Sequence, residues 1–371
     1  MRALSMLRSA RWPVGKDKAA RLKRFHQSEY WPETKAGRRQ HDVSSYWRDA
    51  VENIHTDIGE EIIKIDSPSH YLGPDQIKEL GNIRRIRQRR LLVRLLMRAG
   101  KMGKYVPRTA WNILWNPSVT LANAVLRVHE FVNEVRSAEL AKGAFSRIHE
   151  SDSTPTISLE TLTKLPVLAD QSESSLWMVL YISTVINTLT PYIEKHKVSK
   201  VLEIGPGWGI LSICLHQLYN CRFILVDLPE VLCATFAMIS YYRPNAVVVL
   251  PNELKDIRDD LQGGEFILIC PEQSCLIPSE SVDMAINTSS FQEMTYSLIE
   301  EYFRLINRCI RRGGLFYCLN EKDFKRHRVG GAIEYDRYPW DPGFDDIFHE
   351  EFAFGRLSRA YERMHRLQVK C

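Results

Sequence analysis

The sequence predicts an α/β fold, in which a mostly parallel sheet of seven strands carries helices on both faces and follows a mainly helical N-terminal region. Beyond residue 200, short runs rich in β-branched and aromatic residues alternate with helical runs, which indicates repeated β-α-β units. A turn with three glycines directly follows the first of these runs. The first 110 residues carry 24 Lys and Arg against 12 Asp and Glu, although the whole chain has 50 against 45. The N-terminal part is therefore strongly basic and the rest mildly acidic.

Composition and hydrophobic pattern divide the chain into three parts. Its 371 residues are more than one typical domain needs, and 44% hydrophobic with 26% charged residues is typical of a soluble globular protein. Residues 1–40 are basic and interrupted by proline and glycine, which predicts a weakly ordered tail. Residues 41–170 predict a mainly helical region, and residues 171–371 the α/β domain.

Helical periodicity is the main signal before residue 200. Apolar residues recur at helical spacing over 43–65, 116–135 and 174–196. The most basic predicted helix covers 75–102, where arginines surround a narrow apolar stripe. Such a helix could bind phosphate groups or rest on an anionic membrane surface, but the simplest interpretation is that it packs on the rest of the protein.

The sequence after residue 200 predicts alternating strands and helices. Strands are expected at 200–204, 223–226, 246–250, 266–270, 282–287 and 315–319, with helices at 210–219, 230–242 and 294–311. Residues 351–354 and 365–369 predict a closing antiparallel pair.

The glycine-rich turn carries the first functional signal. The apolar run at 200–204 contains Glu203 and leads into Gly205, Pro206, Gly207, Trp208 and Gly209 before the next helix. Glycine lets the backbone turn sharply and approach a ligand without a Cβ in the way, and the helix offers unpaired N–H groups at its positive end. Such turns bind the ligand in open α/β sheets, but dinucleotide folds favour Gly-x-Gly-x-x-Gly rather than Gly-x-Gly-x-Gly. The spacing therefore indicates a different nucleoside ligand.

Two further turns complete the expected ligand site. Asp227 ends the next strand, just before Leu228, where a carboxylate can accept hydrogen bonds from both ribose hydroxyls. An ordinary helix cap predicts Asp227 as well, but not its pairing with the glycine turn. After the run at 266–270, Gln273 could bond the edge of an adenine ring and Glu272 its amino group, although a surface turn has the same composition.

The acidic residue followed by Gly-x-Gly-x-Gly resembles the first motif of the class I methyltransferases. The resemblance implies a Rossmann-like fold and S-adenosylmethionine as the cofactor, held by the turn and the two carboxylates. With the segments 287–294 and 312–320, the chain looks like bacterial sugar O-methyltransferases over roughly residues 170–370. This likeness implies methyl transfer to a hydroxyl of a sugar or polysaccharide precursor. The resemblance does not extend to the basic N-terminal region.

The resemblance places the acceptor at the carboxyl edge of the sheet. Methyl transfer to a hydroxyl needs an aligned oxygen and a base for its proton. Glu293 is the first candidate base and His327 the second, although Glu293 could instead cap the next helix and His327 could be solvated. The other residues expected here are Asn287 toward the cofactor, and Gln292, Asn320 and Glu321 toward the acceptor. No clustered spacing of ligand residues predicts a metal.

Cysteine spacing and the length of apolar runs also indicate the cellular compartment and the kinds of partner to expect. The eight cysteines form no Cys-x-x-Cys pair, which is typical of buried free thiols in a reducing, cytoplasmic setting. No apolar run approaches the roughly 20 residues that span a bilayer, so membrane contact would be peripheral. We expect a small-molecule or glycan acceptor, with a phosphate-bearing one as a further option.

Two alternatives stay open. A methyltransferase of RNA or protein would use the Arg-rich segment as its anchor. Nucleic acid is less favoured, because residues 287–291 lack the prolines of enzymes that methylate exocyclic amines of DNA bases, and Cys270 precedes Pro271 instead of following it as in cytosine C5 enzymes. The other alternative is an inactive scaffold. Convergence of Glu293, Glu321 and His327 near the methyl group would favour an enzyme.

Overall fold

The computed structural model describes most of the α/β part of the chain and two N-terminal segments. The described residues are 8–31, 54–67, 157, 159–162, 164–171, 176–324, 333–352 and 362–371. The predicted helices at 75–102 and 116–135 and the candidate base His327 lie outside the described residues. The division of the chain into three parts therefore remains a prediction.

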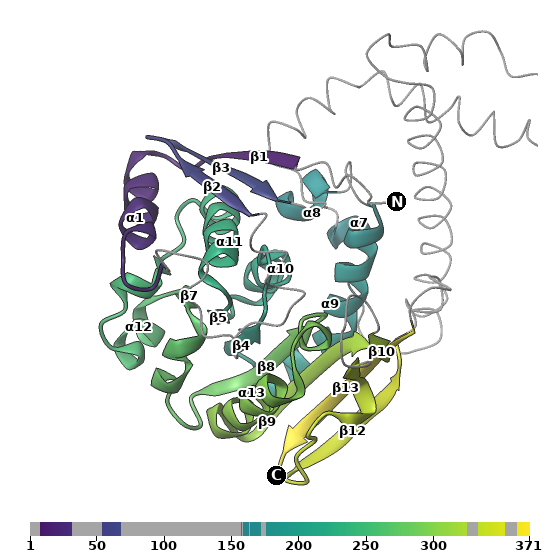
Figure 1. The fold of residues 1–371 in the computed structure, drawn as a ribbon. Helices are drawn as coiled ribbons and strands as arrows, with labels where there is room; N and C mark the ends of the chain where they lie inside the picture. Colours follow the sequence, from purple (N-terminus) through teal and green to yellow (C-terminus); the bar gives the residue numbers. More distant parts are fainter. Residues whose placement is uncertain are drawn as a thin grey trace, which may run out of the picture.

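An eight-stranded sheet forms the centre of the α/β part (Figure 1). Its strands are β4 (Lys200–Ile204), β5 (Arg222–Val226), β6 (Val248–Val249), β7 (Phe266–Ile269), β8 (Val282–Thr288), β9 (Ile310–Glu321), β12 (Phe344–Glu351) and β13 (Arg363–Lys370). Their order is β12-β13-β9-β8-β4-β5-β7-β6, and only β13 runs antiparallel to the neighbours on its two sides. The chain leaves β4 toward β5 and later returns to the other side of β4 as β8, so the order reverses there, where open α/β sheets bind their ligands.

This topology confirms the predicted fold class, a mostly parallel Rossmann-like sheet with helices on both faces. The sheet has eight strands rather than seven: six lie in the runs expected between residues 200 and 319, β6 among them, and β12 and β13 form the closing pair.

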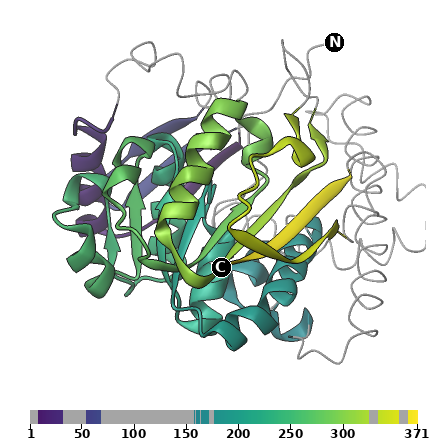
Figure 2. The same cartoon turned by 90° about the horizontal axis from the view of Figure 1, so that it is seen from below.

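Helices cover both faces of the sheet (Figure 2). The bounds are α7 (Leu159–Leu162), α8 (Pro166–Gln171), α9 (Leu176–His196), α10 (Ile210–Tyr219), α11 (Pro229–Tyr242), α12 (Ile257–Gly263) and α13 (Tyr296–Cys309). Alternate strand residues divide the interior into two cores, since successive side chains point to opposite faces. Val201 and Phe223 pack into the core that holds α9, α10 and α11, whereas Leu202 and Ile224 pack into the core that holds α12 and α13.

Short elements connect the strands at their carboxyl ends. They are the 3-10 turns η1 (Pro251–Glu253), η2 (Pro271–Leu276), η3 (Phe291–Glu293) and η4 (Tyr335–Arg337), and the two-stranded pair β10 (Asp323–Phe324) and β11 (Ile333–Glu334). η2 takes the place of a full helix between β7 and β8, and η3 lies between β8 and α13.

The closing pair exists, but its first strand was predicted at the wrong place. β12 occupies 344–351 instead of 351–354, and pairs with β13 in a register that sets His349 opposite Arg366. β12 is an edge strand in which half of the side chains are exposed and half are acidic, so it lacks the apolar alternation that marks a half-buried strand.

The N-terminal segments differ from both predictions made for them. Residues 8–26 are not a weakly ordered tail, because β1 (Arg8–Pro13) and α1 (Lys16–His26) are formed there. The predicted helix over 43–65 is wrong for its described part, where β2 (His55–Ile58) and β3 (Ile62–Ser67) make a hairpin. The isoleucines at 58, 62 and 65 fit helical spacing, but Gly59 donates to the Ile62 carbonyl at 2.9 Å and closes a tight turn between them. Short apolar runs of this kind are ambiguous between the two periods.

These N-terminal strands form a sheet of order β1-β3-β2, which lies beside α11 in Figure 1. In the part of the chain that the structure covers, no helix is both long and apolar enough to cross a membrane. All eight cysteines are described and free, and six of them are buried.

Candidate functional site

The glycine-rich turn follows β4 at the carboxyl edge of the sheet, and each of its three glycines has a positive φ. The φ values of Gly205, Gly207 and Gly209 are 69°, 57° and 74°, a region that L-residues with a side chain rarely adopt. A Cβ on Gly205 would lie 2.3 Å from Oγ of Ser290, and one on Gly209 would lie 3.0 Å from a methyl carbon of Thr235. Gly207 is different, because a Cβ there would meet nothing within 4 Å. The turn therefore packs tightly on both sides and opens at its middle glycine.

Glu203 fixes the strand that leads into this turn. Its side chain is buried in β4, and its Oε2 accepts a hydrogen bond from the hydroxyl of Ser212 on α10. Burial raises the pKa of Glu203 to about 7, and the Ser212 hydrogen bond opposes that rise. Glu203 thus links strand and helix on either side of the turn.

Asp227 stands at the end of β5 and contacts the same turn. Its Oδ2 accepts from the backbone N–H of Gly207 at 3.1 Å, and its Oδ1 accepts from that of Leu228 at 2.8 Å. Burial raises the pKa of Asp227 to about 7, with Glu203 and Glu230 adding to the rise and the two backbone donors opposing it. The structure therefore brings together the two features that sequence reasoning paired.

Trp208, between the last two glycines, is buried against the N-terminal strand β1. Its ring lies 6.0 Å from that of Trp12 in an edge-to-face arrangement, and Trp12 also contacts Tyr241 and Tyr242 of α11. Trp12 is fully buried. Sequence reasoning missed this support. The available signal was one large aromatic residue within an otherwise basic segment, which does not reveal its partner.

Two basic side chains of α1 attach the N-terminal segment to the α/β part. Arg21 makes a two-pronged pair with Glu253 of η1, at 2.8 and 2.6 Å, and also donates to the Val248 carbonyl. Lys18 donates to the carbonyls of Ser240 and Pro244, at the C-terminal end of α11 where a cation is favoured. Some of the basic excess therefore binds within the molecule.

The third predicted corner is arranged differently from the expectation. Gln273 is buried in η2, where its Oε1 accepts from the Cys270 N–H and its Nε2 donates to the Pro251 carbonyl, both at 3.0 Å. One end of the amide thus bonds at the start of η2, and the other end joins η2 to η1. Glu272 is exposed on the same turn.

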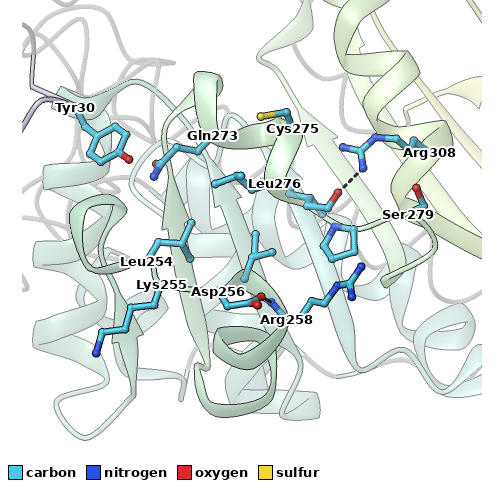
Figure 3. Close-up of a pocket in the computed structure, with 13 residues that line it drawn as sticks. Tyr30, Leu254, Lys255, Asp256, Arg258, Gln273, Cys275, Leu276, Ser279 and Arg308 are labelled. Carbon is cyan, nitrogen blue, oxygen red and sulfur yellow. Dashed lines mark hydrogen bonds between the residues drawn. The ribbon is translucent and has the colours of Figure 1, made fainter.

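A cavity of about 530 Å³ lies beside this corner (Figure 3). The segment 254–258 forms one side and the segment 275–279 the other, with Tyr30 and Gln273 at one end and Arg308 at the other. Arg308 donates to the Ile277 carbonyl and fixes the second side. None of the glycine turn or Asp227 lines this cavity, so it is separate from the site predicted around them.

Buried amides connect the ends of β4, β8 and β9. Asn287 donates to the Ile204 carbonyl at 3.0 Å and accepts from Nδ2 of Asn320 at 2.8 Å. Gln292 accepts from the N–H of Glu321 at 2.6 Å, while its own N–H donates to Asn320 at 3.2 Å. The structure thus gathers the four polar residues predicted at this edge. Three of them hold the strand ends in place with buried amides, and Glu321 is buried next to them.

Glu293 is partly buried at the end of η3. It does not cap the following helix, because Thr295 does so by accepting from the N–H of Leu298. With His327 outside the described residues, the convergence of the two candidate bases stays a prediction. In the described chain, no three His, Cys, Asp or Glu side chains gather into a group that could hold a metal.

Three residues at the same edge were missed from the sequence. The hydroxyls of Tyr181 on α9 and Ser289 after β8 lie 3.1 Å apart, and Arg363 of β13 donates to both. Ser289 has a φ of 61°, unusual for a residue with a side chain. Its position in the turn after β8 was a usable signal. The other two come from distant parts of the chain, which only the fold brings together.

No protein-family model matches the sequence, and no curated protein matches it either. Among solved structures, the chain is similar to a S-adenosylmethionine-dependent methyltransferase from Clostridium acetobutylicum ATCC 824, at 13% identity over 51% of this chain and 90% of that one, with a TM-score of 0.36.

Two further methyltransferase structures give matches of the same size. Geranyl diphosphate C-methyltransferase from Streptomyces coelicolor A3(2), in complex with Mg²⁺, geranyl diphosphate and S-adenosyl-L-homocysteine, is 10% identical over 52% of this chain and 84% of that one, with a TM-score of 0.32. A SAM-dependent methyltransferase from Aquifex aeolicus is 13% identical over 48% and 88%, with a TM-score of 0.31. Similarities of this size assign no reaction, so we base the functional assignment on the site.

Proposed function

We propose that this protein is a S-adenosylmethionine-dependent methyltransferase, and the observation that carries the proposal is the turn 205–209 joined to Asp227. Three glycines with positive φ, the middle one facing open space, provide a backbone surface that a ligand can approach closely. The α10 N-terminus begins directly after the turn and adds its free N–H groups. A carboxylate at the end of the second strand suits a ribose, as in other nucleoside-binding α/β folds.

The residues present fit this cofactor in distinct places. Gly207 leaves room at the middle of the turn, while Asp227 offers two oxygens as acceptors for ribose hydroxyls. Glu203 and Trp208 support the turn from inside the protein. When bound, S-adenosylmethionine supplies an electrophilic methyl group on a sulfonium. The task left to the chain is to align an acceptor and take its proton.

For the acceptor we propose a hydroxyl of a sugar or polysaccharide precursor. This choice rests on the sequence resemblance of the segments 287–294 and 312–320, because the buried amides at the ends of β8 and β9 bond one another. Glu293, which is partly buried and not used as a helix cap, is our candidate for the base that accepts the hydroxyl proton.

An assay of methyl transfer from labelled S-adenosylmethionine tests both the methyltransferase activity and the proposed acceptor. The acceptor panel contains nucleotide-sugars, glycans, bulk RNA and a protein mixture. We expect label on a carbohydrate and a large loss of rate in Glu293→Gln. Label on RNA or protein alone would overturn the sugar acceptor, and full activity of Glu293→Gln would overturn the base. Binding of S-adenosylhomocysteine without any transfer would favour the inactive scaffold.

A further inference from the structure

Arg363 stands out at the carboxyl edge of the sheet because most of its donors have no partner in the part of the chain that the structure describes. Its Nη1 donates to the hydroxyls of Ser289 and Tyr181. Its Nη2 lies 3.8 Å from Oε1 of Glu321, which is an ion pair but too long for a hydrogen bond. Among the described residues, neither Nε nor Nη2 has a hydrogen-bond partner. A guanidinium carries five N–H donors, and Nε with Nη2 forms the fork that matches a carboxylate or phosphate.

The guanidinium is held in a fixed orientation. It lies over the ring of Tyr181, with 5.3 Å between its central carbon and the ring centroid. The Ser289 hydroxyl holds Nη1 from the side, and the positive φ of Ser289 puts that hydroxyl there. The side chain is 19% exposed, so a ligand can reach it without unfolding the edge.

The position connects this group with the proposed reaction. Ser289 adjoins Ser290, whose hydroxyl would clash with a Cβ on Gly205 and donates to the Ile204 carbonyl at 3.1 Å. Arg363, Tyr181 and Ser289 therefore lie next to the glycine turn, with Ser290 between them and Gly205. They are on the side of the turn toward β9 and β13.

We propose that Arg363, oriented by Tyr181 and Ser289, binds an oxyanion of the acceptor, a phosphate or a carboxylate, through Nε and Nη2. The proposal rests on the proposed methyltransferase function and narrows its acceptor to an anionic one. Glu321 balances the guanidinium when no ligand is present and weakens anion binding by like-charge repulsion.

The test is isothermal titration of the full-length protein with sodium phosphate and, separately, sodium acetate, at constant ionic strength. We expect at least one ion to bind, about tenfold weaker in Arg363→Gln and tighter in Glu321→Gln. Arg363→Lys should retain part of the affinity, because a lysine keeps the charge but loses the fork. The relative affinity of the two ions distinguishes a phosphate acceptor from a carboxylate one.

Arg366→Gln is the matched control. Arg366 lies on the same strand and is similarly buried, but its donors are taken by Asp346. Equal loss in both variants, unchanged binding in Arg363→Gln, or no binding of either ion to the wild type would overturn the proposal. S-adenosylhomocysteine is titrated in parallel. If the anions bind but S-adenosylhomocysteine does not, the proposed methyltransferase function is wrong. If S-adenosylhomocysteine binds but the anions do not, only the proposal for Arg363 is wrong.

Discussion

The backbone N–H of Gly207 donates a hydrogen bond to Oδ2 of Asp227 across 3.1 Å, so the middle of the glycine turn and the end of β5 form one unit. In sequence these features are separate motifs. In the structure the carboxylate faces a turn that cannot carry a side chain at Gly205 without striking Ser290.

The first prediction concerns pH. Burial raises the pKa of Asp227 from 3.8 to about 7, and Glu203 behaves in the same way. A carboxyl whose folded pKa lies above its unfolded value stabilises the protein below about pH 4 and loses that contribution as the pH rises to 7. The full loss for one such group is roughly 4 kcal/mol.

The free energy of unfolding of Asp227→Asn, measured with denaturant and without ligand, should therefore fall less steeply than that of the wild type between about pH 4 and 7. Nucleoside binding should have the opposite dependence, because only the ionised carboxylate accepts from both ribose hydroxyls. We expect S-adenosylhomocysteine to bind wild type more tightly at pH 8 than at pH 6, and Asp227→Asn to bind weakly at both. Glu203→Gln separates the contribution of the neighbouring carboxyl. If the affinity of the wild type for S-adenosylhomocysteine falls as the pH rises, the assignment of Asp227 to the ribose is contradicted.

The second prediction uses the open face of Gly207. Alanine there keeps a strained positive φ, at a cost of roughly 1–2 kcal/mol, and puts a methyl group into the space that we assign to the ligand. Gly313→Ala is the control, since Gly313 has a φ of 70° and no atom nearer than 3.8 Å to its Cβ position. Both variants should lose similar stability, but only Gly207→Ala should lose S-adenosylhomocysteine affinity, by tenfold or more. Equal affinity in the two variants would remove Gly207 from the site.

The third prediction concerns Trp12. Truncation of a fully buried tryptophan costs about 3–5 kcal/mol, and here the cavity would open beneath Trp208. We expect Trp12→Ala to lower both the denaturant midpoint and the nucleoside affinity, and Trp12→Phe to restore most of the affinity. Trp31→Ala changes the same segment at a ring that contacts Phe25 and His26 instead. If it weakens nucleoside binding as much as Trp12→Ala does, support of the turn is not specific to Trp12.

The fourth prediction is a coupling between Arg21 and Glu253. The hydrogen bonds from Arg21 and from the Leu250 N–H outweigh burial and hold the pKa of Glu253 below its usual value. A double-mutant cycle with Arg21→Gln and Glu253→Gln should give an interaction energy of about 1–3 kcal/mol. Additive effects would show that the α1 contact contributes nothing through this pair.

The sequence predicted the structure correctly where a pattern of residues was compatible with only one kind of local structure. The alternation of strands and helices after residue 200 predicted the sheet, and the glycine spacing with Glu203 and Asp227 predicted a unit that the structure shows to be in contact. It failed where local patterns were ambiguous or partners were distant. Gln273 looked available for a ligand, yet the Pro251 carbonyl occupies its amide. Arg363 gave no signal, because its hydroxyl partners come from α9 and the end of β8.

The contact between Trp12 and Trp208 also sets an order of assembly. Trp12 precedes its partner Trp208 by almost 200 residues in the sequence, and most strands of the large sheet come after Trp208. Contacts of such long sequence separation are slow to form, because the intervening chain must be closed into a loop first. The N-terminal strand β1 therefore docks late, onto the glycine turn and α11 rather than into the eight-stranded sheet.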